Sequence, residues 1–317
     1  MSTMVKPSTI TLSSRVPADA NGEALIDYLA RRFRYHDRAA WRLVLEAGRV
    51  HLDDVQATGA ERLQPGMTLR YEKEHREPPV NTDFRVLHAD EQLLVVDKPA
   101  HLPMHADGPF IRNTLIHLLR RSYGAGIQLV HRLDRETSGV VVAARSKDVQ
   151  AAIQRQFGLD IEKRYLAVVD GLLQQSMVCE QEIGHHPRSA VRLRRSASPD
   201  ARAPQRARTA VEPVEHGPSR TLVRCRPTTG RTHQIRVHLE HQGHPVVGDK
   251  LYGRSDEAYL AFVRRMKSGG SVFEAEDETP NRQLLHAHAI TLRHPSDGRV
   301  VTFESPLPAE FRRWLLC

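Results

Sequence analysis

The chain contains 317 residues, of which 40% are hydrophobic and 26% charged, so it can form about two globular domains with buried cores. Lysine and arginine outnumber aspartate and glutamate by 46 to 38; this net charge of +8 favours a polyanionic partner such as nucleic acid, although a solvated basic surface gives the same sum. The sequence has no apolar run long enough to span a membrane, no secretory signal at residues 1–14 and only three scattered cysteines, so we expect a cytoplasmic protein.

The first part of the chain predicts a small unit of two helices and a hairpin behind a polar tail. Residues 1–14 are expected to be disordered. Apolar residues recur at helical spacing from Asn21 and again from Trp41, and strands are expected at 49–52 and 67–72. We therefore predict a compact domain over residues 15–74, followed by a polar, proline-containing linker at 75–83.

The remainder, residues 84–317, predicts a larger domain in which strands outnumber helices. Helices are expected at 113–123 and 147–157, and strands at 84–87, 93–96, 140–143, 165–169, 221–225, 235–239, 289–292 and 300–304. The varied connections indicate an α+β class with a largely antiparallel sheet.

An arginine-rich segment interrupts this pattern. Residues 189–208 are low in hydrophobicity and contain two prolines, which predicts a mobile basic loop. Its arginines, with Arg188, could contact phosphates through counterion release, or the loop could simply be solvated.

The densest group of chemically active residues runs from His131 to Gly139, directly before an apolar strand. Asp134 lies between Arg132 and Arg135, and neighbouring positive charge favours an ionised carboxylate. A turn that leads into a rigid strand can present a catalytic carboxylate, but an ordinary surface ion pair would give the same pattern. A kinase catalytic loop does not fit, because Leu133 intervenes and no glycine-rich phosphate loop precedes it. A glycosidase would need a second carboxylate, for which Glu136 is the candidate.

The same string, His131-Arg132-Leu133-Asp134-Arg135-Glu136-Thr137-Ser138-Gly139, resembles the signature motif of the RluA-type pseudouridine synthases. The resemblance continues in order through Val95–Pro99, Lys163-Arg164-Tyr165, Gly230–His238, Gly248–Gly253 and Leu285-His286-Ala287. It covers the chain from about Phe84 to the C-terminus, and several separate motifs in the family's order are highly specific. It implies a pseudouridine synthase fold, with a mixed, mostly antiparallel sheet and flanking helices.

The resemblance implies that uridine in RNA is isomerised: the base is detached, rotated and rejoined through carbon 5. Asp134 would be the nucleophile, whether on ribose or on base, Tyr165 would stack on the base and assist removal of the carbon 5 proton, and Arg236 would keep Asp134 ionised. Arg132 would fill the space left by the flipped nucleotide, and Arg231 would contact phosphate. The other residues expected to contact RNA are His131, Arg135, Lys163, His233, Gln234 and Lys250.

The segment before this domain weakly resembles the αL-type RNA-binding module. Gly48-Arg49-Val50 and Leu63–Gly66 fit that module, but residues 41–46 lack its basic helix, so a degenerate supporting unit is the alternative. The reaction is redox-neutral and implies no cofactor. Histidine pairs such as His185-His186 and His286–His288 lack a carboxylate or cysteine that would complete a zinc site, so no metal is expected.

Three classes of function follow from these patterns. The favoured one is an RNA pseudouridine synthase that flips uridines out of structured RNA, with ribosomal RNA as first choice and transfer RNA as second. The first alternative is a non-catalytic RNA-binding or ribosome-assembly protein on the same fold. A hydrolase of small glycosides is the third, weakened by the basic charge and by the lack of a clear second carboxylate. Nothing in the sequence demands more than a monomer.

Overall fold

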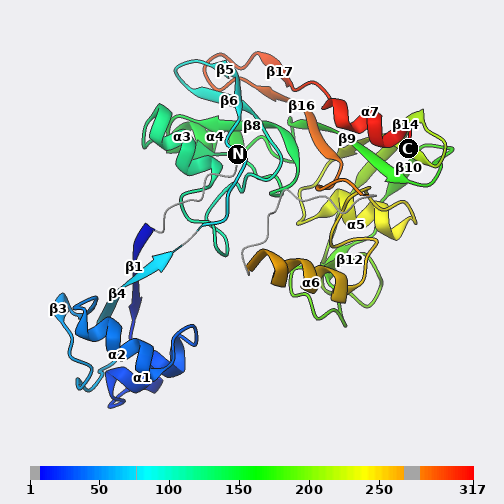
Figure 1. Ribbon diagram of the computed structural model, residues 1–317. Coiled ribbons are helices and arrows are strands. Elements are labelled where there is room, and N and C mark those ends of the chain that lie inside the picture. Colours follow the sequence, from blue (N-terminus) through cyan, green and yellow to red (C-terminus); the bar gives the residue numbers. More distant parts are fainter. Residues whose placement is uncertain (1–7, 76, 268–278) are drawn as a thin grey trace. The chain divides into compact units, whose positions relative to one another are not determined.

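The computed structural model describes residues 8–75, 77–267 and 279–317 and divides the chain into two compact units, Met1–Glu77 and Pro78–Cys317 (Figure 1). In the first unit, four strands pair in the order β1-β4-β2-β3 beside two helices. The bounds are β1 (Ser8–Arg15), η1 (Ala18–Ala20), α1 (Leu25–Arg32), α2 (Arg38–Glu46), β2 (Val50–Leu52), β3 (Val55–Gln56) and β4 (Thr68–His75). Their shared core is built around Leu25, Leu29, Trp41 and Leu69, none of which is exposed to solvent.

The prediction of a disordered tail at residues 1–14 is wrong from Ser8 onward. Residues 8–15 form β1, which pairs antiparallel with β4 along its whole length. Ile10 is buried and Leu12 packs against the core, which is the two-residue period of a strand. The polar residues between them hid this period in the sequence. The first part of the predicted tail, residues 1–7, lies outside the described residues.

The second unit is built on one large mixed sheet. Its strands run in the order β10-β14-β15-β9-β16-β8-β6-β5, with β17 on β16 and β7 on β8, and among the described strands only the β16–β8 pair is parallel. The bounds are β5 (Arg85–Ala89), β6 (Leu93–Lys98), β7 (Gln128–Leu129), β8 (Ser138–Ala144), β9 (Glu162–Asp170), β10 (Met177–Cys179), β14 (Thr209–His216), β15 (Arg220–Pro227), β16 (Leu285–Arg293) and β17 (Val300–Glu304). This confirms the expected α+β class with a largely antiparallel sheet.

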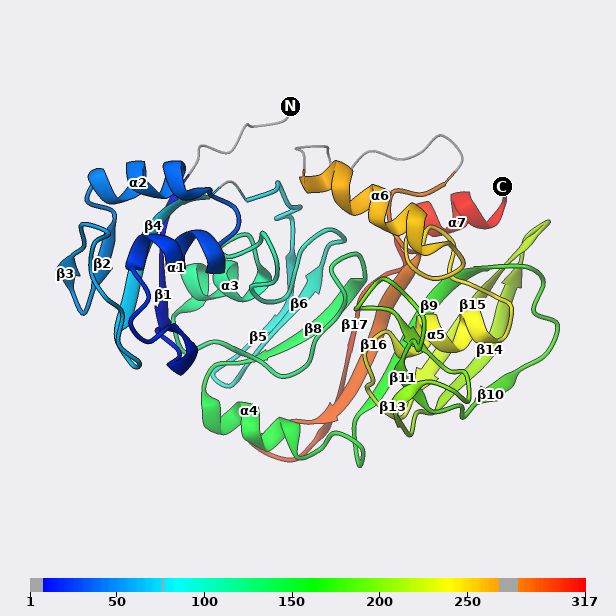
Figure 2. The same cartoon turned by 90° about the horizontal axis from the view of Figure 1, so that it is seen from below.

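Helices cover both faces of this sheet (Figure 2). Alternate residues of β8 face opposite sides, so Val141 packs with α3 (Leu115–Tyr123), whereas Val142 packs with Ile153 of α4 (Lys147–Gln154). In β9, Ala167 packs toward α5 (Gln234–His241), and Leu166 packs toward α7 (Ala309–Leu315). The central strands are therefore buried on both faces, which fixes the position of the loops at their ends.

The predicted strand at 235–239 is wrong, because these residues lie in α5. Ile235, Val237 and Leu239 alternate with polar residues in the sequence and so imitate the period of a strand. Every residue from Gln234 to Leu239 is buried, including the polar ones. A helix enclosed on several sides needs no polar face, and the periodicity rule fails there.

The mobile loop predicted at 189–208 is also wrong. Its residues include β12 (Arg195–Ser196) and β13 (Arg202–Gln205), which pair with β11 (Ile183–His185) in a small sheet. Val191 and Ala197 are buried in a cluster with Tyr252, and the buried Arg194 pairs with Asp256 at 2.9 Å at the start of α6 (Asp256–Lys267). Partners distant in sequence order this segment, so its composition alone was misleading.

Gly139 allows β8 to approach β16 closely at the start of their parallel pairing. Its φ is +113°, and a Cβ there would overlap the carbonyl group of Ala287. We expect Gly139→Ala to lower the free energy of unfolding by roughly 2–5 kcal/mol, measured by urea denaturation. Gly124→Ala is the matched control, because its φ is +106° with no atom within 4 Å of the new Cβ. Gly124→Ala should lower the free energy of unfolding by only about 1–2 kcal/mol. Equal losses in both variants would contradict the close approach of β8 to β16 at Gly139.

Candidate active site

A cavity of about 570 Å³ opens beside the central strands of the second unit. Its walls come from the loop between β7 and β8, from β9, and from residues 227–236, which lead into α5. The lining side chains with polar or aromatic chemistry include His131, Arg132, Asp134, Phe157, Lys163, Tyr165, Arg231, His233, Gln234 and Arg236. Residues that are distant in the sequence thus share one open space, large enough for a small ligand or a single base.

Asp134 is the carboxylate on the wall of this cavity. Its Oδ2 accepts a hydrogen bond from Nη1 of Arg236 at 2.7 Å and a longer one, 3.4 Å, from Nε2 of Gln283. Nε2 of His233 lies 3.9 Å from the other carboxylate oxygen. The Asp134 side chain keeps 25% of its surface exposed, against 8% for Arg236. The carboxylate is therefore held in place but accessible from the cavity.

Arg236 bridges two carboxylates. Its Nε and Nη2 donate to both oxygens of Asp249, at 2.6 and 2.8 Å, while its Nη1 reaches Asp134. The guanidinium lies over the ring of Tyr252, 4.9 Å from its centroid. Asp249 is buried and also accepts backbone N–H groups from Leu251 and Tyr252. A planar guanidinium fixed this firmly can aim one of its remaining N–H groups at Asp134 with little freedom.

Asp249 is the site residue that sequence reasoning missed. The motif Gly248–Gly253 points to Lys250 as a contact residue and leaves Asp249 without a role. Chain separation hides the pairing, because Asp249 lies 13 residues after Arg236 and only the folded chain brings the two side chains into a buried ion pair. The signal that could have found it is a lone acidic residue inside a matched motif.

The electrostatics keep Asp134 ionised. Burial acts to raise the pKa of Asp134, but its interactions with His233, wherever that ring is protonated, and with Arg236, including the Arg236 hydrogen bond, outweigh burial and hold the pKa below its usual range. Burial also lowers the pKa of His233 to about 4, so this ring is neutral near pH 7. Arg236 is therefore the charge that stabilises the Asp134 carboxylate at neutral pH.

Tyr165 extends from β9 into the cavity and packs against two apolar clusters, one formed with β8 and α3 and the other with β15 and α5. Burial, followed by the nearby charge of Asp134, raises the pKa of Tyr165. The side chain is thus a neutral phenol at physiological pH. A neutral aromatic ring beside a carboxylate can stack on a planar ligand and offer its hydroxyl group as a hydrogen-bond partner.

The residues predicted to contact RNA form two sets at the cavity: three cations, and three side chains that already make hydrogen bonds within the protein. Arg132, Lys163 and Arg231 line it; Arg132 is exposed and has no hydrogen bond or ion pair to any described residue. Lys163 and Arg231 donate to the backbone carbonyls of Thr229 and Arg206, at 3.0 Å each. These three cations can meet an anion at the entrance.

His131, His233 and Gln234 also line the cavity, and each already makes hydrogen bonds within the protein. Nε2 of His131 accepts the backbone N–H of Val142 at 3.1 Å, and Nδ1 of His233 shares a 2.8 Å hydrogen bond with the Tyr252 hydroxyl. The Gln234 side chain is buried and ties the loop at Thr229–Arg231 to β14. These side chains shape the site more than they offer free hydrogen-bonding groups.

Arg135 and Lys250 do not line the cavity. Both pair with Glu136, at 2.9 and 2.8 Å, and Glu136 is buried away from the cavity as well. Lys250 and then Arg135 overcome the effect of burial and lower the pKa of Glu136 to about 2. Glu136 therefore cannot serve as a second carboxylate of a glycosidase, which would have to reach the substrate.

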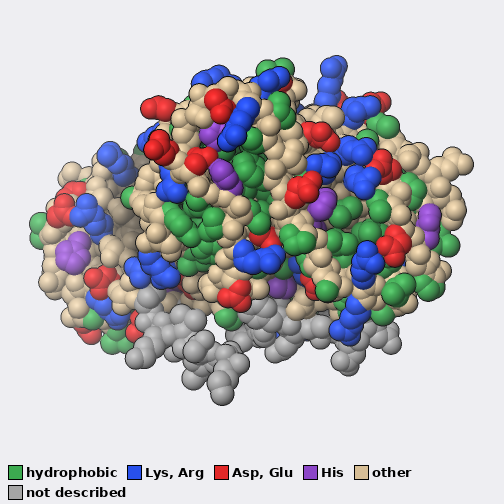
Figure 3. Space-filling view, turned by 90° about the horizontal axis from the view of Figure 1, so that it is seen from above, with side chains coloured by type: hydrophobic (Ala, Val, Ile, Leu, Met, Phe, Trp, Pro, Cys, Tyr) green, Lys and Arg blue, Asp and Glu red, His purple; other side chains and the backbone are tan. Residues whose placement is uncertain are grey.

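Charged side chains of both signs are scattered over the face seen in Figure 3, where blue Lys and Arg groups lie among red Asp and Glu groups. The net charge of the chain is thus not gathered into a single basic field on that face.

Among the residues that the structure describes, no helix is long and apolar enough to cross a membrane.

Comparison with known proteins identifies the family. Residues 92–241, which include every lining residue of the cavity except Leu285, match a family model described as RNA pseudouridylate synthase. Relatives include proteins named ribosomal large subunit pseudouridine synthase D from Xanthomonas campestris, 33% identical over 94% of this chain and 89% of the relative, and from Nitrosomonas europaea, 32% identical over 94% and 85%. The chain belongs to the RNA pseudouridylate synthase family.

Solved structures of family members agree with this assignment. Human RNA pseudouridylate synthase domain containing 1 is 27% identical, with a TM-score of 0.56 over 73% of this chain and 86% of that chain. Domain containing 4, also human, is 28% identical, with a TM-score of 0.55 over 73% and 91%. The resemblance to RluA-type pseudouridine synthases is confirmed, and the protein is an isomerase.

Acid is expected to destabilise this pseudouridine synthase. Burial lowers the pKa to about 4 for His101, His131, His233 and His286, whereas the unfolded chain protonates histidine near pH 6.5. Between these values the unfolded state binds more protons, so stability falls as the pH falls. We expect a loss on the order of 1–2 kcal/mol per histidine from pH 7.5 to 5, measured by urea denaturation. Equal stability at both pH values would contradict the neutral buried state of these rings.

Proposed function

We propose that this enzyme isomerises specific uridines in ribosomal RNA to pseudouridine, with Asp134 as the nucleophile. The observation that carries the proposal is the Arg236–Asp134 ion pair, which keeps an ionised carboxylate on the wall of an open cavity of about 570 Å³. A carboxylate nucleophile suits a reaction in which a glycosidic bond is broken and a new bond to carbon 5 is formed.

The other cavity residues have complementary roles in this proposal. Tyr165 stacks on the target base as a neutral phenol. Arg132, exposed at the edge of the cavity, fills the space that the flipped nucleotide leaves, because a stacked base could not reach Asp134. Lys163 and Arg231 contact the phosphates on either side.

Ribosomal RNA is the proposed substrate because the relatives that align along nearly their whole length are named as large-subunit ribosomal enzymes. The test is the release of tritium from RNA labelled at carbon 5 of uridine, since joining the ribose to carbon 5 expels that hydrogen. Unmodified large-subunit ribosomal RNA should release tritium with the wild-type enzyme, and transfer RNA transcripts should not. Release from transfer RNA alone would overturn the proposed substrate.

RNA binding should weaken steeply with salt, because phosphate contacts release bound counterions. Replacing Lys163 or Arg231 by alanine should reduce the slope of log K against log salt by about one for each phosphate that the variant no longer neutralises. Arg121→Ala is the control, since Arg121 is exposed on α3 outside the cavity. Filter binding at salt concentrations from about 50 to about 200 mM measures this slope. A slope unchanged in both cavity variants would contradict their phosphate contacts.

A further inference from the structure

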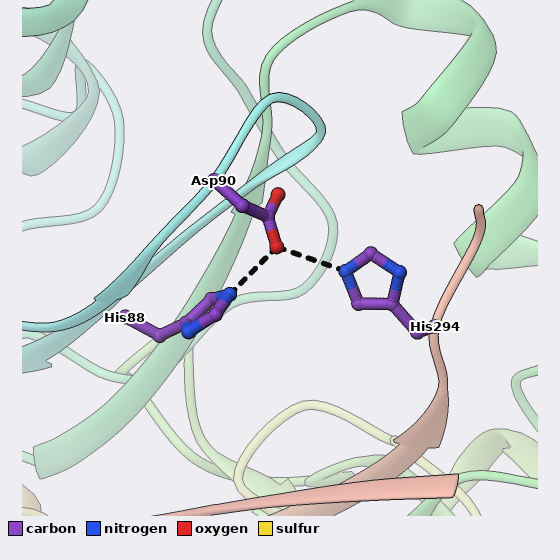
Figure 4. Close-up of side chains that lie close together, drawn as sticks. All are labelled: His88, Asp90 and His294. Atoms are coloured by element: carbon purple, nitrogen blue, oxygen red, sulfur yellow. Dashed lines mark hydrogen bonds and ion pairs between the residues drawn. The ribbon is translucent and has the colours of Figure 1, made fainter. Parts of the chain in front are cut away.

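Three potential metal ligands converge at the edge of the second unit, away from the cavity (Figure 4). His88 lies on β5, Asp90 in the turn that follows, and His294 directly after β16. Nε2 of His88 is 2.6 Å and Nε2 of His294 is 3.0 Å from the same oxygen, Oδ2 of Asp90. Two imidazole nitrogens and a carboxylate oxygen thus point toward one place.

Hydrogen bonds from the surrounding atoms orient Asp90 and His294. Oδ1 of Asp90 accepts the backbone N–H groups of Gln92 and Leu93, at 2.8 and 2.7 Å, which leaves Oδ2 directed at the two rings. Nδ1 of His294 lies 2.7 Å from the hydroxyl group of Ser296. Hydrogen bonds from the outer nitrogen of a histidine and to the outer oxygen of a carboxylate are the usual way to orient metal ligands.

We propose that His88, Asp90 and His294 bind one divalent transition-metal ion, for which zinc is the best match. Two imidazoles and one carboxylate are a common zinc set, with water in the fourth position. Ligands at 2.0–2.1 Å lie roughly 3.3 Å apart around a tetrahedral ion, so the Asp90 oxygen has to move from the rings by well under 1 Å. The His88 and Asp90 side chains are about one-third exposed, at 34% and 30%, which lets an ion and its water enter.

Metal binding requires each ring to present its Nε2 to the ion and to carry its proton on Nδ1. Without metal, each Nε2–H donates to Asp90; with metal, Nε2 binds the ion and the proton resides on Nδ1. In His294 that Nδ1–H then donates to the hydroxyl group of Ser296, and the backbone N–H of Ser296, which donates to Nδ1 at 3.3 Å without metal, loses this partner. Because the ion joins the turn after β5 to the segment after β16, it would fasten the outer strand to the centre of the sheet. The site therefore acts on stability and leaves turnover unchanged.

The experiment is calorimetric titration of the full-length, chelator-stripped protein with zinc chloride. We expect one tight site per chain and a rise in the thermal midpoint of roughly 5–10 °C at a hundredfold excess over Kd. His88→Ala and Asp90→Asn should each weaken binding at least tenfold. His117→Ala, which removes an exposed histidine of α3, should bind like the wild type. Absence of a site, or equal affinity in all variants, would overturn the proposal.

X-ray absorption on the zinc-loaded wild type tests the same site without any substitution. The spectrum should show two imidazoles and oxygen neighbours bound directly to the ion. Sulfur bound to the ion would assign it to a cysteine, such as the exposed Cys317, and would likewise overturn the proposal.

Discussion

Asp134→Asn should abolish pseudouridine formation, lowering turnover at least about 10⁴-fold while RNA affinity stays within about threefold of the wild type. The amide is nearly the same size as the carboxylate, but it carries no charge and is a poor nucleophile. Single-turnover tritium release measures the chemical step, and filter binding measures affinity.

The control for this variant is Glu162→Gln. Glu162 is an exposed carboxylate at the start of β9, so it tests the loss of a nearby charge without touching the cavity. It should release tritium at the wild-type rate. Turnover by Asp134→Asn within tenfold of wild type would show that this carboxylate does not form the covalent bond.

Arg236→Lys should lower turnover about 10²–10³-fold although it preserves the positive charge. An ammonium group is a single point and cannot hold both oxygens of Asp249 while it donates to Asp134, as the guanidinium does. The pKa of Asp134 should rise as this contact weakens. More of Asp134 is then protonated at a given acidic pH, so the rate should begin to fall at a higher pH than in the wild type.

Asp249→Asn tests the other half of the bridge. Arg236 keeps its charge but loses part of its anchor, so we expect a smaller loss of turnover, about tenfold, with KM little changed and an acid limb shifted in the same direction. Arg164→Lys is the control, because the ion pairs of Arg164 with Glu162 and Glu304 lie at the surface and contribute little. An unchanged pH profile in both bridge variants would show that Arg236 does not set the ionisation of Asp134.

The sequence predicted those elements whose signals are local. Apolar residues 140–143 lie in the buried strand β8, and the spacing from Trp41 marks α2. The predictions from sequence failed at α5 and at residues 189–208, where burial by distant parts of the chain determines the structure. Buried polar residues such as Arg236 and Arg194 resemble surface residues until their partners, Asp249 and Asp256, are known.

The family and its candidate nucleophile followed from the sequence alone, because the contiguous string from His131 to Gly139 carries them in order. The folded chain was needed to show which charges are free. Asp134 faces the cavity and Arg236 reaches it from a helix about one hundred residues later, whereas Arg135 and Lys250 are bound to Glu136. Folding also brings His294 to the turn at Asp90. An ion pair depends on separation in space and on exclusion of water, and a linear pattern contains neither.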